Sequence, residues 1–145
     1  MRSTNCLALL FATLAPVAVH AQARTQVVPA GMAASPNLSP GIRAGNIIYA
    51  SGQLGMRRDN PDTTVGGQTK IALENTQKVF EAAGTTMANA VKCTVFLIDA
   101  ADFQQMNAAY REFWPKEPPA RSTVVIAALV VAGAKVEIEC MAAIP

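Results

Sequence analysis

Apolar residues recur at helical spacing in two segments of the chain, residues 68–83 and residues 99–114. One face of the first segment carries Ala72, Thr76, Val79, Phe80 and Ala83. The corresponding stripe of the second carries Phe103, Met106, Tyr110 and Phe113. Gly84 follows the first segment where a helix commonly ends, and Asp99 precedes the second as an N-cap. We therefore predict two amphipathic helices.

Short apolar runs of strand type lie around these helices. Residues 47–51 follow Gly45-Asn46, a pair that favours a tight hairpin with residues 41–44. Further strands are expected at residues 91–98, 122–131 and 136–144. The order β, β, α, β, α, β, β predicts an α+β domain, a mixed sheet with both helices on one face. The other face, expected to carry Thr94, Phe96 and Met141, is uncovered, which predicts a symmetric homo-oligomer.

The first residues have the layout of a secretory signal peptide. Arg2 precedes an apolar run from Leu7 to Val19, and small residues allow cleavage after Ala21 or Ala23. The run is shorter than the about 20 residues of a membrane-spanning helix, although an uncleaved anchor is the alternative. We expect export to the periplasm or the exterior, with no membrane contact after cleavage.

Removal of residues 1–21 leaves 124 of the 145 residues, enough for one folded unit. We expect residues 22–40 to form an extended N-terminal arm and residues 41–145 to form the domain. The formal charge falls from +2 to +1, because Arg2 is one of 12 basic residues set against 10 acidic ones. This near-neutral charge argues against nucleic acid as a partner.

Histidine and cysteine limit the chemistry further. The single histidine, His20, lies in the expected signal peptide, so the mature chain has no obvious transition-metal site and no Ser-His catalysis. Cys93 and Cys140 lie in apolar runs. Whether they form a disulfide or remain small buried thiols is left open, because the sequence does not give the distance between them.

Arg121 is the strongest candidate for chemistry. It opens an apolar strand directly after Pro118-Pro119, and its planar fork of N–H donors suits a carboxylate. The alternative is an ordinary surface arginine. Glu137 and Glu139 alternate with apolar residues, so both point to the uncovered sheet face, where a carboxylate could activate water or simply be solvated.

Two further positions are candidates on weaker grounds. Ser51-Gly52 ends a strand, and a glycine there allows close approach of another group, although it can also simply terminate the strand. Asn107 lies off the apolar stripe of the second helix, where asparagine is mildly unfavourable. It is either functional or an exposed helical residue.

Several of these segments, in order, resemble the RidA (YjgF/YER057c, L-PSP) family. The matching segments are GNIIYASGQ at 45–53, ALEN at 72–75, VKCTVFL at 91–97, FQQMNAAYREF at 103–113, PARSTV at 119–124 and KVEIE at 135–139. They extend over about residues 36–143. The resemblance implies a chorismate-mutase-like fold and a homotrimer with a central barrel, with active sites in the clefts between subunits. It also implies hydrolysis of enamines and imines such as 2-aminoacrylate to a 2-keto acid and ammonia.

Carried over residue by residue, the resemblance makes Arg121 the clamp for the substrate carboxylate and Glu137 the residue that activates water. Ser51, Gly52 and Thr123 would line the pocket and Asn107 would support it. No metal or cofactor is needed, because an iminium carbon is already electrophilic.

The chain departs from the family at a few positions. Leu38 replaces a tyrosine that commonly closes the pocket, and residues 129–134 replace a shorter, charged turn. These changes leave the substrate open. A small-carboxylate-binding or holdase-like module without catalysis is the main alternative function. An endoribonuclease is a lesser one, disfavoured by the near-neutral charge and the lack of histidine.

Overall fold

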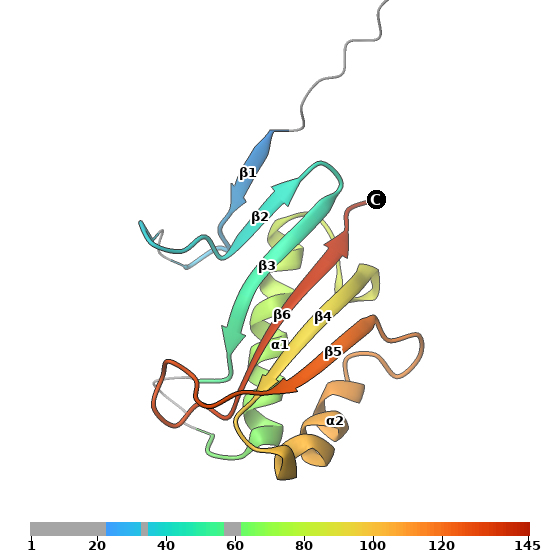
Figure 1. Ribbon diagram of the computed structural model, residues 1–145. Coiled ribbons are helices and arrows are strands. Elements are labelled where there is room, and N and C mark those ends of the chain that lie inside the picture. The colour runs from blue at the N-terminus through green and yellow to red at the C-terminus, as the bar shows by residue number, and fades with distance from the viewer. Residues whose placement is uncertain (1–22, 33–34, 57–61) are drawn as a thin grey trace, which may run out of the picture.

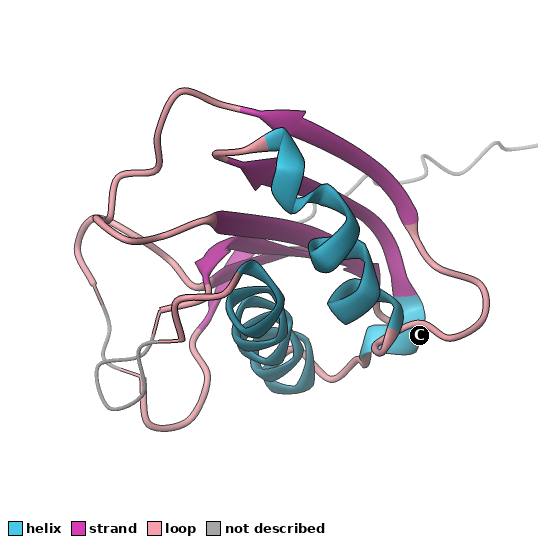
Figure 2. Ribbon diagram, turned by 90° about the horizontal axis from the view of Figure 1, so that it is seen from below, coloured by secondary structure: helices cyan, strands magenta, loops and turns pink. Residues whose placement is uncertain are grey.

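The computed structural model describes residues 23–32, 35–56 and 62–145, which form a mixed sheet with two α-helices on one face (Figures 1 and 2). The strands are β1 (Arg24–Val27), β2 (Gly41–Ala44), β3 (Ile47–Leu54), β4 (Ala90–Leu97), β5 (Ala120–Val125) and β6 (Val136–Ala143). The helices are α1 (Val65–Ala82) and α2 (Phe103–Arg111), with 3-10 turns η1 (Met87–Asn89) and η2 (Ala100–Asp102). The strand order is β1-β2-β3-β6-β4-β5, and only the β4–β5 pair is parallel.

Both predicted helices are confirmed, with shifted ends. α1 begins at Val65 because the Thr64 hydroxyl accepts a hydrogen bond from the Gly67 backbone N–H and caps the helix. Asp99 accepts a hydrogen bond from the Ala101 N–H, but the turn that it caps is η2. The regular part of α2 therefore begins only at Phe103, and it ends at Arg111, earlier than the sequence pattern suggested.

β6 lies in the middle of the sheet, and its side chains alternate between the two faces. Val136, Ile138, Cys140 and Ala142 are buried against the helices. Glu137 and Glu139 lie on the opposite face, which no helix of the described residues covers (Figure 2). They pair with Phe96 and Thr94 of β4, respectively. The predicted uncovered face is therefore confirmed.

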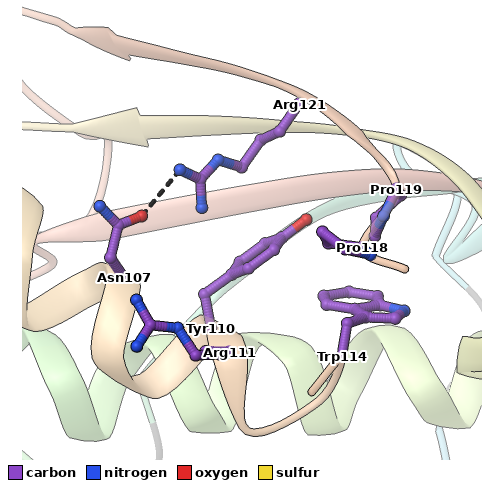
Figure 3. A pocket seen from close by; sticks show the side chains of 7 residues that line it. All are labelled: Asn107, Tyr110, Arg111, Trp114, Pro118, Pro119 and Arg121. Carbon is purple, nitrogen blue, oxygen red and sulfur yellow. Dashed lines mark hydrogen bonds between the residues drawn. The ribbon is translucent and has the colours of Figure 1, made fainter. Parts of the chain in front are cut away.

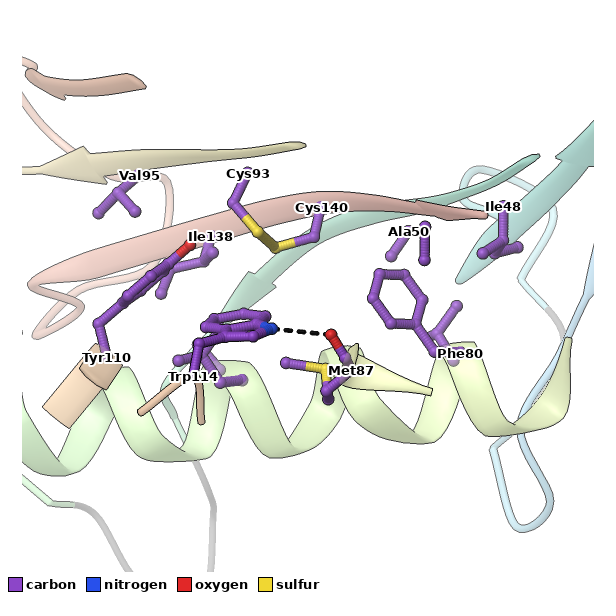
Figure 4. Close-up of a cluster of buried hydrophobic side chains, with 14 of the residues drawn as sticks. Ile48, Ala50, Phe80, Met87, Cys93, Val95, Tyr110, Trp114, Ile138 and Cys140 are labelled. Carbon is purple, nitrogen blue, oxygen red and sulfur yellow. Dashed lines mark hydrogen bonds between the residues drawn. A yellow bond between two sulfur atoms is a disulfide. The ribbon is translucent and has the colours of Figure 1, made fainter. Parts of the chain in front are cut away.

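Cys93 of β4 and Cys140 of β6 form a disulfide, which answers the question that the sequence left open. The two residues are directly opposite each other on neighbouring strands, and their Cα atoms are 4.1 Å apart. The bond lies in the core, between the sheet and the aromatic residues of the helix layer (Figure 4).

Two predicted segments differ from the structure. The expected N-terminal arm at residues 22–40 contains β1, which pairs with β2 and so extends the sheet beyond the expected domain boundary. The strand expected at 122–131 ends at Val125, because after the Ile126 N–H bonds to the Leu97 carbonyl the chain leaves the sheet. Residues 126–135 form a loop whose tip, Val130, is 95% exposed.

The predicted signal peptide, residues 1–21, lies outside the described residues. Within the part of the chain that the structure describes, no helix has the length and apolar character needed to cross a membrane.

Candidate active site

Arg121 lies at the start of β5, with its side chain directed toward α2 (Figure 3). It pairs with Cys93 in the parallel β4–β5 ladder and therefore shares the helix-facing side of the sheet. Its Nη2 donates a 2.7 Å hydrogen bond to the Oδ1 atom of Asn107. Its Cζ atom lies 4.6 Å from the centre of the Tyr110 ring. The side chain is half-buried, and its Nη1 also donates a long hydrogen bond of 4.0 Å to Sδ of Met106. These bonds use two of the five N–H donors and leave the others for a ligand.

A cavity of about 410 Å³ adjoins this guanidinium. Its walls are Asn107, Tyr110, Arg111, Trp114, Pro118, Pro119 and Arg121 (Figure 3). None of these side chains is a carboxylate, so the cavity is electropositive and suits an anionic ligand. Burial raises the pKa of Tyr110 to about 12, and the opposing effect of Arg121 is smaller, so the phenol is protonated at neutral pH.

A second group of candidate residues surrounds Glu137 on the other face of the sheet. Gly52 of β3 lies so close that a Cβ atom on it would collide with Oε1 of Glu137 and force the carboxylate to move. The Ser51 hydroxyl donates a 2.7 Å hydrogen bond to the Ser39 carbonyl. The prediction that Ser51-Gly52 ends the strand is wrong, because β3 continues to Leu54 after an irregularity in its pairing with β6 between Ala50 and Gln53. Glu137 also borders a cavity of about 180 Å³. The other walls of that cavity are apolar: Phe96, Ile126, Ala128, Leu129 and Val130.

The structure thus places Arg121 and Glu137 on opposite faces of one sheet. Arg121 is level with Cys93, and Glu137 with Phe96, three residues further along β4. An odd separation inverts the face, and three residues span about 10 Å along a strand. A single chain therefore does not bring the two expected catalytic side chains together.

The remaining expected site residues are divided between these two groups. Asn107 belongs with Arg121. Thr123 is paired with Val95 on the same face as Arg121, and its buried hydroxyl has no hydrogen-bond partner among the described residues. Leu38 is 55% exposed and directly precedes Ser39, which binds Ser51.

Two residues were not identified as site residues from the sequence. Tyr110 was assigned to the core stripe, and it is both buried and a wall of the Arg121 cavity. Its position three residues after Asn107 was the available signal. Gln68 is buried, donates to the Gly133 carbonyl and accepts from the Lys135 N–H. It thereby holds the loop that leads into Glu137. The described residues contain no group of three side chains able to hold a metal ion.

Comparison with known proteins is consistent with this geometry. The model of the family described as Endoribonuclease L-PSP matches residues 29–144. This chain belongs to the L-PSP family, which includes YjgF and RidA. The human protein named 2-iminobutanoate/2-iminopropanoate deaminase is 36% identical over 107 residues, which cover 72% of this chain and 77% of the human one.

Other members of the L-PSP family are similarly close. The chloroplastic Reactive Intermediate Deaminase A of Arabidopsis thaliana is 39% identical over 110 residues, 72% of this chain but only 57% of the plant protein. The YjgF gene product of E. coli superimposes with a TM-score of 0.71 at 35% identity, covering 82% of this chain and 94% of that one. The fold is therefore that of the L-PSP family.

Proposed function

We propose that this protein is an enamine/imine deaminase that hydrolyses amino-acid-derived 2-imino acids to 2-keto acids and ammonia. The observation that carries the proposal is the Arg121 guanidinium, which donates to Asn107 and Met106 and borders an electropositive cavity with donors left for a ligand. A bidentate bond to an α-carboxylate is what such a fork forms best. The deaminase names of relatives at 36–39% identity support the same reaction.

The reaction requires positioning and one proton acceptor. Arg121 would hold the carboxylate, which places the adjacent C=N carbon for attack. Glu137 would accept a proton from water as the oxygen bonds to that carbon and the C=N π electrons move to nitrogen. With the imine protonated, Glu137 would return this proton to nitrogen and then take the hydroxyl proton of the tetrahedral intermediate as C=O forms and the C–N bond breaks to release ammonia. An enamine would first take up a proton at carbon to become the imine.

We further propose that the complete site forms between copies of the chain, in a homotrimer of the kind that the family resemblance implies. Arg121 and Glu137 lie on opposite faces of one sheet, so one copy supplies each group separately. The uncovered face, with Phe96, Thr94 and Met141, is available to a second copy. The ligand would then be a small imino or keto acid, bound at a junction of subunits.

A mixing experiment tests both the activity and the shared site. Arg121→Ala and Glu137→Ala variants should each lose ketoacid formation from an amino-acid oxidase product. When the two are unfolded and refolded together at equal amounts, about one quarter of the sites would combine an intact Arg121 with an intact Glu137. Recovery of about a quarter of the wild-type rate is expected. No recovery, with trimers present, would contradict the shared site.

A non-catalytic carboxylate-binding module predicts a different result. Pyruvate or 2-ketobutyrate would then stabilise the protein against heat in an Arg121-dependent way, while the imine would disappear no faster than in buffer. Unchanged turnover in Arg121→Ala would instead show that Arg121 does not bind the substrate.

We also propose that the protein is exported, as its first residues suggest. The buried Cys93–Cys140 disulfide supports this, because such bonds persist in oxidising compartments. Fractionation of cells that express the full chain should find the protein outside the cytoplasm, and deletion of residues 2–21 should retain it inside. An equal distribution of the two forms would contradict export.

A further inference from the structure

Four residues of α2 contact the Arg121 guanidinium, and one of these contacts is a long hydrogen bond of 4.0 Å from Nη1 to Sδ of Met106. Phe103, Asn107 and Tyr110 follow one another at i, i+4 and i+7, so their side chains lie in one row. The Phe103 ring centre is 6.0 Å and the Tyr110 ring centre 4.6 Å from Cζ, and Asn107 accepts the hydrogen bond. The Tyr110 ring is the nearer of the two aromatic rings, close enough for a favourable cation–π contact.

The Tyr110 ring is itself fixed from behind. Its centre lies 4.7 Å from that of Trp114, and the indole Nε1 donates a 2.7 Å hydrogen bond to the Met87 carbonyl (Figure 4). All three residues are buried. Arg121 therefore rests on a pair of packed rings, tilted by 37° to each other, of which Trp114 is hydrogen-bonded to η1.

The hydroxyl of Tyr110 does not help to hold this pair of rings in place. It is buried, and it has no hydrogen-bond partner among the described residues. The contact with Arg121 is made by the ring, whose centre lies 4.6 Å from Cζ.

We infer that Tyr110 is a positioning residue for the proposed substrate clamp, acting through the face of its ring on Arg121. The inference rests on the proposed function, because it assumes that Arg121 binds the substrate carboxylate. An arginine side chain has several rotatable bonds, and a ring beneath the guanidinium limits the orientations of its fork. Asn107 holds one edge of the fork and Tyr110 supports its plane.

The test separates ring from hydroxyl. Tyr110→Phe keeps the ring, so KM and kcat should stay within about twofold of wild type, with unchanged or higher thermal stability. Tyr110→Leu removes the ring and should raise KM roughly three- to thirtyfold with a smaller change in kcat, because the clamp acts in both the ground and the transition state. Phe113→Leu is the matched control: Phe113 packs on Trp114, and it should leave KM unchanged.

Two results would overturn the inference. If Tyr110→Phe is as damaging as Tyr110→Leu, the hydroxyl is the active group. If Tyr110→Leu weakens ketoacid binding to the same degree with and without Arg121→Ala, measured by calorimetry, Tyr110 does not act through Arg121.

A spectroscopic measurement keeps the inference testable even if the deaminase activity is absent. The side-chain NMR signals of Arg121 should be shifted by the ring current of Tyr110. That shift should persist in Tyr110→Phe and disappear in Tyr110→Leu. An unshifted Arg121 signal in the wild-type protein would overturn the inference by itself, whereas missing turnover with a normal shift would overturn only the proposed function.

Discussion

The two halves of the proposed site are built in different ways. On the helix side, Arg121 is held by side chains of α2. On the other side, Glu137 lies against Gly52, whose lack of a side chain leaves room for the carboxylate, and beside a loop that is apolar and largely exposed. The Arg121 half is therefore arranged by packing between α2 and β5. The second lies on an open face and is the half that an assembly partner would complete.

Gly52→Ala should give the largest effect, a loss of activity that acts through the Glu137 half alone. The new Cβ would collide with the end of the Glu137 side chain, which is flexible enough to rotate away at little expense in stability. We expect kcat to fall about a hundredfold or more, the scale of a lost general base, with only a small change in the melting temperature. Gly66→Ala, which meets only ordinary contacts, is the control and should leave activity unchanged. Normal kcat in Gly52→Ala would argue against Glu137 as the proton acceptor.

Reduction of the Cys93–Cys140 disulfide should affect both halves together, because it joins β6, which carries Glu137, to β4, which pairs with the Arg121 strand β5. The bond closes a loop of 47 residues, for which a loss of about 2–4 kcal/mol in unfolding free energy is expected on reduction. Denaturant unfolding with and without reductant measures it. A Cys93→Ala, Cys140→Ala double variant should no longer respond to reductant. If reductant also leaves the unfolding free energy of the wild-type protein unchanged, the bond does not stabilise the fold.

Gln68→Leu should destabilise the loop before Glu137. The loss in unfolding free energy should be comparable to, or smaller than, the loss on reduction of the disulfide. The buried amide bonds to the backbone at Asp62, Gly133 and Lys135, and leucine would leave these groups unpaired. We expect a loss of about 2–3 kcal/mol in unfolding free energy. Gln77→Leu, which removes only an exposed bond to Glu81, should change stability by less than about 0.5 kcal/mol. Similar losses of stability in both variants would show that the buried bonds of Gln68 contribute no more than the exposed bond of Gln77.

The smallest expected effect concerns the helix side alone. Burial raises the pKa of Tyr110 from 10.0 to about 12. The folded state thus retains the phenol proton more tightly than the unfolded state, so this stability is fully present below pH 10 and is lost as the pH rises through 12. We expect a loss of about 1–2 kcal/mol in wild type beyond that in Tyr110→Phe. Parallel pH curves for the two proteins would show that Tyr110 is not buried as the structure has it.

Local patterns predicted most of the elements correctly. The apolar stripes of α1 and α2 follow from helical spacing, and the alternation around Glu137 and Glu139 placed both on the uncovered face. β1 was missed because Arg24–Val27 is mostly exposed and is a strand only through its pairing with β2. β5 was expected to be too long because the apolar run continues beyond the point where pairing with β4 stops.

By itself, the sequence determined the two helices, the hairpin of β2 and β3, the family and the residue types of the proposed site. These depend on spacing and on short motifs, which act over a few neighbouring residues. Only the tertiary structure decided that Cys93 faces Cys140, that Gln68 holds the loop before β6, and that Tyr110 lies under Arg121. It also placed Arg121 and Glu137 on opposite faces. Each of these depends on the register between strands or on packing between elements distant in the chain, and no local preference specifies either.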